Sequence, residues 1–212
     1  MHRHEVFDDV HYVGWRKSRL DKIQTIFGKD WFKGKSILEL ACGQGHIGSY
    51  IETLGANVTY AEGRKSHCEM MTKLHPKREV ININQEEPWS LDRQFDMIIH
   101  WGVLYHLDNW KQDLACTLKH SGMVLLESEV LDSNDSIEIK IEEPFDGWDQ
   151  AISTVGSRPS ASLVEQVLSS LGATYTRYDH ADLNSGFHQY DWKVENTGES
   201  RNGIRRFWIV EK

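Results

Sequence analysis

Residues 38–48 read LELACGQGHIG, a short apolar segment that runs directly into three spaced glycines. Gly43, Gly45 and Gly48 match the pattern G-x-G-x-x-G, which follows a strand and opens a helix in dinucleotide-binding folds. Glycine lets the backbone come close to a ligand, because it carries no side chain. The pattern alone fits a nicotinamide or flavin cofactor but does not require one, so the rest of the chain has to decide.

The composition indicates one globular domain with an acidic balance. The 212 residues, 39% of them hydrophobic, are enough for one sizeable core, which predicts a single domain over residues 1–212. The net charge of −8 argues against a large phosphate-binding surface. Three cysteines without a paired framework favour a reducing, cytoplasmic location. No apolar stretch approaches the roughly 18 residues of a membrane-spanning helix, so no membrane contact is predicted.

Strand-like and helix-like segments alternate along the chain. Apolar spacing predicts an amino-terminal helical segment within residues 1–35, with its helix at 13–32. Strands are expected at 36–41, 57–62, 79–84, 95–100 and 122–130, with helices at 45–55, 64–75 and 109–120. A helix at 160–172 and strands at 173–180 and 204–212 follow. This alternation is typical of an α/β fold, in which helices cover both faces of a parallel sheet.

Ligands of such sheets bind at the carboxyl ends of the strands, so residues at those ends discriminate between cofactors. Glu62 ends the second strand about 20 positions beyond Gly43, where a carboxylate accepts hydrogen bonds from ribose hydroxyls. Because Glu62 lies at a strand tip, its replacement is expected to leave folding intact. Glu39 lies inside the first strand, where a carboxylate can fix the loop and face an ammonium group. The segment HWGVLYHL (100–107) has no role in one half of a simple dinucleotide-binding fold. These features favour a cationic amino-acid cofactor over a nicotinamide.

The segments LELACGQG, YAEGR, NQEEPW and FDMIIHWGVLYHL, in this order within residues 36–130, resemble the successive motifs of class I S-adenosylmethionine-dependent methyltransferases. This resemblance implies S-adenosylmethionine as the cofactor. It also implies a doubly wound, Rossmann-like sheet of seven strands, mostly parallel with an antiparallel last strand. GVLYHL and RPSASLVEQVLSSLGA also resemble the methyltransferase domain of tRNA wobble-uridine carboxymethyltransferases and their small-molecule relatives.

The resemblance assigns cofactor-binding roles by position. It places Glu39, Ala41, Gly43 and Gly45 near the methionine portion, Glu62 and Gly63 near the ribose, Asn84 and Gln85 near the adenine, and His100 beside the methionine carboxylate. Here the glycines admit the backbone close to the cofactor, with no phosphate to hold. Gly48 is interpreted as a contact between helix and strand. The alternative for His100 is a histidine packed at a strand end.

Tyr105 and His106, just past the fourth predicted strand, are the candidate catalytic residues. The sulfonium methyl group is already activated, so positioning supplies most of the acceleration. A base is needed only when the acceptor is a hydroxyl or a protonated amine, and the ordinary pKa of histidine suits that role. His106 could instead be structural, and Tyr105 could orient either the acceptor or the methyl end of the cofactor.

Two long segments, 130–160 and 181–200, are predicted to form the acceptor side. The first contains Glu142, Glu143, Phe145, Asp146, Trp148, Asp149 and Arg158, and the second contains His188, Tyr190, Asp191 and Trp192. Mixed aromatic and acidic residues suit a small-molecule or glycan acceptor better than a nucleic acid. The bland alternatives are a solvated excursion for the first segment, and a dimer contact or a poorly ordered loop for the second.

Three other functions stay open at this stage. An RNA-modifying enzyme is disfavoured by the acidic charge and by the absence of a large extra amino-terminal domain in this sequence. A non-catalytic cofactor-binding module fits the same motifs, and a nicotinamide enzyme fits the glycine pattern taken literally. No metal is predicted, because His2, His4 and His11 form no ligand pattern such as H-E-x-x-H.

Overall fold

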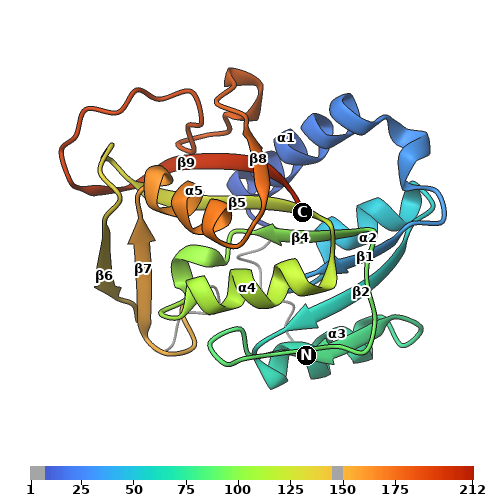
Figure 1. Ribbon diagram of the computed structural model, residues 1–212. Coiled ribbons are helices and arrows are strands. Elements are labelled where there is room, and N and C mark those ends of the chain that lie inside the picture. The colour runs from blue at the N-terminus through green and yellow to red at the C-terminus, as the bar shows by residue number, and fades with distance from the viewer. Residues whose placement is uncertain (1–7, 145–149) are drawn as a thin grey trace.

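The computed structural model describes residues 8–144 and 150–212. Its main sheet has seven strands in the order β3-β2-β1-β4-β5-β9-β8 (Figure 1). The strands are β1 (Ser36–Glu39), β2 (Asn57–Glu62), β3 (Glu79–Asn82), β4 (Met97–Trp101), β5 (Met123–Leu131), β8 (Thr174–Arg177) and β9 (Ser200–Glu211). Strands β1 to β5 run parallel, and β9 runs antiparallel to both β5 and β8. The predicted Rossmann-like sheet with an antiparallel last strand is confirmed.

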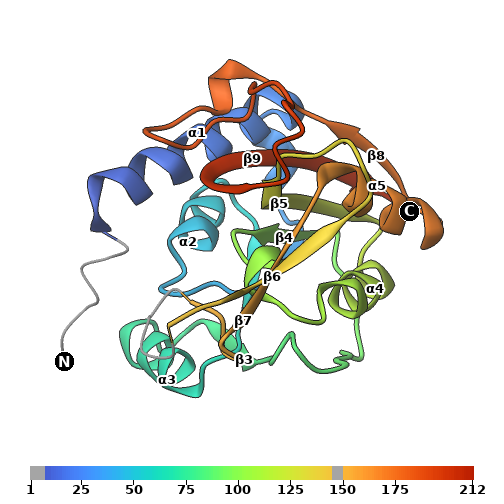
Figure 2. The same ribbon diagram turned by 90° about the vertical axis from the view of Figure 1, so that its left-hand side faces the viewer.

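Helices cover both faces of this sheet (Figure 2). They are α1 (Val10–Phe27), α2 (His46–Thr53), α3 (Lys65–Leu74), α4 (Trp110–His120) and α5 (Ala161–Ser170). Neighbouring strand residues point to opposite faces. In β1, Ile37 packs into the core shared with α1, α2 and α3, whereas Leu38 packs into the core shared with α4 and α5. The α/β arrangement is therefore doubly wound.

Helix and strand ends follow local chemistry. Helix α1 stops at Gly28, whose φ of 78° is favourable only for glycine, and a 3-10 turn (Lys29–Phe32) continues the chain. The predicted helix at 13–32 therefore begins and ends too late. Helix α5 begins after Ser160, whose hydroxyl accepts a hydrogen bond from the backbone N–H of Leu163 at 3.1 Å, as the sequence predicts.

The long segment 130–160 forms more than a surface loop. Strands β6 (Glu138–Glu142) and β7 (Val155–Pro159) pair antiparallel as a separate two-stranded sheet. This hairpin stands beside the carboxyl ends of the parallel strands and contacts the short 3-10 turn Leu104–His106 (Figures 1 and 2). The second segment, 181–200, begins with a short 3-10 turn (Ala181–Leu183) against α1. That residues 1–212 form a single domain stays a prediction.

Candidate active site

A cavity of about 540 Å³ lies at the carboxyl ends of the parallel strands. Its walls come from the glycine loop, α1, the turn Leu104–His106, the β6–β7 hairpin and segment 181–200. The cavity is lined by these predicted site residues: Glu39, Ala41, Gly43, Glu62, Gly63, Asn84, Gln85, Tyr105 and His106. Sequence positions that are far apart therefore converge on one concave site, as expected for this fold class.

The glycine loop takes its shape from left-handed backbone positions and one buried acid. Ala41 and Gly43 have φ values of 49° and 54°. The carboxylate of Glu39 accepts a hydrogen bond from the backbone N–H of Gly48 at 2.9 Å. A side chain on Gly48 would meet Glu39 and Tyr60 at 2.5 Å, so the third glycine provides close packing between helix and strand. Burial raises the pKa of Glu39 to about 8.

Glu62 closes the other side of the loop. Its Oε2 accepts a hydrogen bond from the backbone N–H of Gly43 at 3.0 Å, and its Oε1 accepts one from Arg64 at 3.0 Å. Burial alone would raise the pKa of Glu62, but the neighbouring His67 and these backbone donors hold it below its ordinary value. The carboxylate is thus ionised, and its unused lone pairs are available to hydroxyl groups in the cavity.

A buried acid, Asp113 of α4, organises the residues beyond β3 and β4. Its carboxylate accepts hydrogen bonds from Gln85 Nε2 at 3.0 Å and Trp89 Nε1 at 2.8 Å. It also lies 2.6 Å from His100 Nε2. Gln85 is buried in this contact, whereas Asn84 is half-buried. Asn84 is therefore the more accessible of the two predicted adenine contacts.

Two predicted cofactor residues do not line the cavity. The His100 side chain is fully buried, on the α4 side of β4, where it pairs with Asp113. The structure therefore does not bring the His100 side chain to the cavity, which agrees with the alternative of a histidine packed at a strand end. Its place beside the methionine carboxylate stays a prediction. Gly45 instead begins α2 with a φ of 69°, and a side chain there would meet Met71 and Tyr60. It shapes the loop without facing the cavity.

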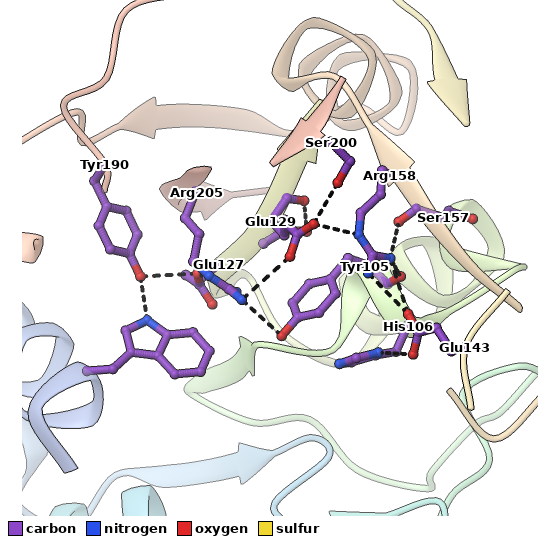
Figure 3. Close-up of polar contacts among 12 residues, drawn as sticks. Tyr105, His106, Glu127, Glu129, Glu143, Ser157, Arg158, Tyr190, Ser200 and Arg205 are labelled. Atoms are coloured by element: carbon purple, nitrogen blue, oxygen red, sulfur yellow. Dashed lines mark hydrogen bonds and ion pairs between the residues drawn. The ribbon is translucent and has the colours of Figure 1, made fainter. Parts of the chain in front are cut away.

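The opposite end of the cavity holds a buried network of arginines and glutamates (Figure 3). Arg205 of β9 lies 3.2 Å from Glu127, and it donates to the hydroxyl of Tyr105 at 3.2 Å. Arg158 of β7 lies 2.8 Å from Glu129. Both glutamates lie in β5 and are buried. The hydrogen bond from Arg205 thus fixes the position of the Tyr105 side chain in the cavity wall.

His106 makes one close polar contact. Its Nδ1 lies 2.6 Å from the carboxylate of Glu143, which follows β6 (Figure 3). Burial would raise the pKa of Glu143, but the contact with His106 and other nearby donors hold it low. An ionised carboxylate only accepts hydrogen bonds, so this contact requires a proton on Nδ1 of His106.

Sequence reasoning missed the contribution of α1 to this site. His11, Tyr12, Trp15, Arg16 and Arg19 all line the cavity. They recur three and four residues apart, which places them on one helix face. The signal was therefore present: two arginines and three ring side chains on a face that otherwise looks like an ordinary packing surface.

Both predicted acceptor segments reach the cavity in part. Segment 130–160 contributes Ile141, Gln150, Ala151, Ile152 and Arg158, and segment 181–200 contributes Phe187, His188 and Ser200. Phe145, Asp146, Trp148 and Asp149 lie outside the described residues. Tyr190 lies behind the site, where its hydroxyl donates to Glu127 at 3.1 Å, and neither Asp191 nor Trp192 lines the cavity. Burial, together with Arg205, lowers the pKa of His188 to about 2, so this ring stays uncharged.

In the described ranges 8–144 and 150–212, two other features are absent: a cluster of metal ligands and a membrane-spanning helix. No group of three or more His, Cys, Asp or Glu side chains is arranged to hold a metal ion. Within the same ranges, the helices are too short or too polar to span a bilayer.

The family model described as "Methyltransferase domain" matches residues 11–195 of this chain. The chain belongs to this methyltransferase family. The expectation of a class I methyltransferase that uses S-adenosylmethionine is confirmed. A comparison with curated proteins found no match.

Solved structures similar to this methyltransferase share its fold at low identity. The N-terminal domain of EvdMO1 with SAH bound is 16% identical, with 93% of this chain and 80% of that one covered and a TM-score of 0.65. The plantazolicin methyltransferase BpumL, in complex with a triazolic desmethylPZN analog and SAH, is 16% identical over 98% and 89%, with a TM-score of 0.64. The glycopeptide N-methyltransferase MtfA, complexed with S-adenosylmethionine, is 17% identical over 93% and 93%, with a TM-score of 0.60.

The stability of the methyltransferase is expected to depend on the proton that Glu39 holds. The pKa of Glu39 rises from 4.5 to about 8 on folding, so in this window the folded chain holds a proton that the unfolded chain has lost. The stability from this proton is present below pH 4.5 and is lost as the pH rises toward 8. In urea unfolding, the wild type should lose about 1 kcal/mol or more across this window relative to Glu39→Gln, which cannot titrate. Parallel pH curves for the two proteins would contradict this account.

Proposed function

We propose that this methyltransferase holds S-adenosylmethionine at the glycine-loop end of the cavity and transfers its methyl group to oxygen or nitrogen of a small molecule or a glycan unit. The observation that carries the proposal is the meeting of three parts in one cavity. These are the glycine loop, the strand-end acid Glu62, and the turn that bears Tyr105 and His106. The first two would hold the cofactor, and the third faces the acceptor.

At the cofactor end, each residue has a distinct proposed task. The unused lone pairs of Glu62 would accept hydrogen bonds from the ribose hydroxyls, and Asn84 would face the adenine. Glu39 already binds the loop through Gly48 and would face the methionine ammonium group. Gly63 would lie near the ribose, and a side chain there would meet Ile152 at 2.5 Å, so glycine lets Ile152 pack beside this part of the cavity.

At the acceptor end, the charges favour a small acceptor over a phosphate polymer. Arg19, Arg158 and Arg205 line the cavity, but each lies within 3.3 Å of a buried glutamate oxygen. These arginines are therefore neutralised within the protein and are not presented to a polyanion. The aromatic side chains of Tyr12 and Phe187 supply apolar surface at the same end. That MtfA is a glycopeptide methyltransferase and BpumL a plantazolicin methyltransferase supports small or peptide-like acceptors here.

Calorimetry tests the cofactor assignment directly. We expect S-adenosylhomocysteine to bind the full chain with one molecule per cavity, and NAD not to bind, because Glu39 and Glu62 place two acidic side chains at the glycine loop, where a pyrophosphate would lie. Binding of NAD without a response to S-adenosylhomocysteine would restore the nicotinamide interpretation of the glycine pattern.

The acceptor class and the catalytic role are tested by methyl transfer. S-adenosylmethionine with a labelled methyl group is incubated with the enzyme and with separated metabolite, glycan and tRNA fractions. Label is expected in the metabolite or glycan fraction. Label in tRNA alone would establish the RNA-modifying alternative, and cofactor binding without transfer to any fraction would support a non-catalytic module.

A further inference from the structure

The carboxylate of Glu143 is held from three sides within the β6–β7 hairpin. Its Oε2 lies 2.6 Å from His106 Nδ1 and accepts a hydrogen bond from the backbone N–H of Ala151 at 2.7 Å. Its Oε1 accepts hydrogen bonds from both terminal nitrogens of Arg158 at 3.2 Å. Both Glu143 and Arg158 are more than nine-tenths buried. The carboxylate therefore has one orientation, and that orientation fixes the imidazole ring.

Arg158 is itself held in place by further hydrogen bonds, which restrain the Glu143 carboxylate that it contacts. Its Nε donates to Glu129 at 2.8 Å, and one terminal nitrogen donates to the backbone oxygen of Tyr105 at 2.5 Å. Gly156 lies where these groups meet. A side chain at Gly156 would collide with Glu143, Arg158 and the backbone of Tyr105. Glycine at position 156 therefore allows the buried ion pair of Glu143 and Arg158 to pack against the turn Leu104–His106.

The other charged and titratable groups around His106 are few. The ring centroid of Tyr105 lies 4.1 Å from that of His106, and the Arg158 guanidinium lies 5.0 Å from the Tyr105 ring. Among the described residues, Glu143 alone lies within hydrogen-bond distance of an imidazole nitrogen of His106. Its ionised carboxylate places the proton on Nδ1, so Nε2 is the nitrogen that can take a proton from a group in the cavity.

We infer that Glu143 and Arg158 are positioning residues that make His106 a general base, and that the methyl acceptor is therefore a hydroxyl group. The inference rests on the proposed methyl transfer. In the reaction, the bond from sulfur to the methyl carbon breaks and its electron pair stays on sulfur. A bond from the acceptor oxygen to the methyl carbon forms, and the hydroxyl proton moves to His106 Nε2. The ionised Glu143 then faces the resulting imidazolium.

A hydroxyl explains this arrangement better than other acceptors. An amine that has lost its ammonium proton before it binds attacks with its own lone pair, and a carboxylate carries no proton at neutral pH, so neither of these needs a base during attack. A hydroxyl loses its proton as the new bond forms, and a rigid base within the cavity accelerates that step. An aligned histidine–carboxylate pair would be of little use to the first two acceptors.

The tautomer of His106 tests the pair without any acceptor. In the full chain with S-adenosylhomocysteine bound, nitrogen-15 NMR of the imidazole is expected to show the proton on Nδ1 and a lone pair on Nε2. Glu143→Gln should change this signature. Glu142→Gln, the same change at the exposed neighbouring residue, should leave it as in the wild type. An unchanged signature in Glu143→Gln, with S-adenosylhomocysteine still bound, would overturn the positioning role.

Turnover gives a second measurement that does not depend on the NMR result. Glu143→Gln should lower turnover about tenfold or more in the fraction that accepts label, while the KM for S-adenosylmethionine changes less than about twofold. His106→Asn should lower turnover at least as much, and the double variant should be no slower than His106→Asn, because the two residues act as one unit. Independent, multiplying effects would contradict that unit.

The bond formed identifies the acceptor. With a carbon-13 methyl group on the cofactor, the chemical shift of the product separates methyl ethers from methylamines, and resistance to mild base separates ethers from methyl esters. A methyl ether supports the inference, whereas a methylamine or a methyl ester overturns it even if the methyltransferase itself is confirmed. Absence of any transfer would overturn the proposed function, and with it the role of His106 as a base.

Discussion

Replacing Glu62 with glutamine is expected to weaken binding of S-adenosylhomocysteine roughly tenfold to a hundredfold, because charged hydrogen bonds to the ribose would be lost. Calorimetry of the two proteins measures the change. Glu69→Gln is the matched control, since Glu69 is an exposed acid on the following helix, α3. Unchanged affinity in Glu62→Gln would place the ribose elsewhere.

The same substitution is also expected to cost folding stability, contrary to the sequence-based expectation. Glu62 lies at a strand tip, but its side chain is buried and accepts hydrogen bonds from the backbone N–H groups of Gly43 and Arg64. The amide nitrogen of glutamine would face one of these donors, at a cost of about 1–3 kcal/mol in urea unfolding. Measuring both quantities separates a lost ribose contact from a displaced loop.

The parts of this fold that could be predicted are those in which local pattern decides structure. Apolar spacing and the start of helix α5 at Ser160 depend on neighbours in the sequence. Gly28 was a stop signal of the same local kind, although the predicted helix at 13–32 ran past it. The order of motifs around Gly43 and Glu62 then places the cofactor end at the carboxyl edge of the sheet. These inferences needed no knowledge of which distant side chains meet.

The His100 side chain does not reach the cavity, for a reason that the sequence contained. Successive strand residues face opposite sides, and the cavity is lined by Ile99 and Trp101 of β4. His100 shares the other side with Ile98, where α4 supplies Asp113 as its partner. Applying the alternation residue by residue would have removed His100 from the candidate contacts.

The end of the cavity around Tyr105 and His106 could not be predicted to the same depth, because its contacts join distant segments. Glu143 meets His106 only because β6 and β7 pair as a hairpin against the turn Leu104–His106. The aromatic and arginine face of α1 reaches the cavity only because α1 docks beside segment 181–200, where Ser18 donates to the backbone oxygen of Leu183 at 3.0 Å. The first contact leaves no local pattern in the sequence. The second leaves the spacing of arginines and ring side chains on α1, which does not by itself say what that face contacts.

Glu127 is the residue on which this docking depends. Its carboxylate lies 3.3 Å from Arg19 of α1 and 3.2 Å from Arg205 of β9. It also accepts a hydrogen bond from the hydroxyl of Tyr190 (Figure 3). That hydroxyl in turn accepts one from Trp15 Nε1 at 2.7 Å. Glu127 is fully buried, so water cannot replace any of these contacts. One carboxylate thus joins α1, β5, β9 and segment 181–200.

Glu127→Gln should therefore lower the free energy of unfolding by about 3–5 kcal/mol, because it keeps the shape of the side chain but leaves two buried guanidinium groups without their shared negative charge. Urea unfolding measures this change. Asp21→Asn is the control, since it breaks only the exposed pair with Lys17 on α1 and should cost less than about 0.5 kcal/mol. Similar losses for the two variants would mean that Arg19 and Arg205 are stabilised by other groups. A large loss for Glu127→Gln alone would show that the buried charge of Glu127 stabilises the contact between α1 and β9. Apolar packing of α1 would then be insufficient for this contact.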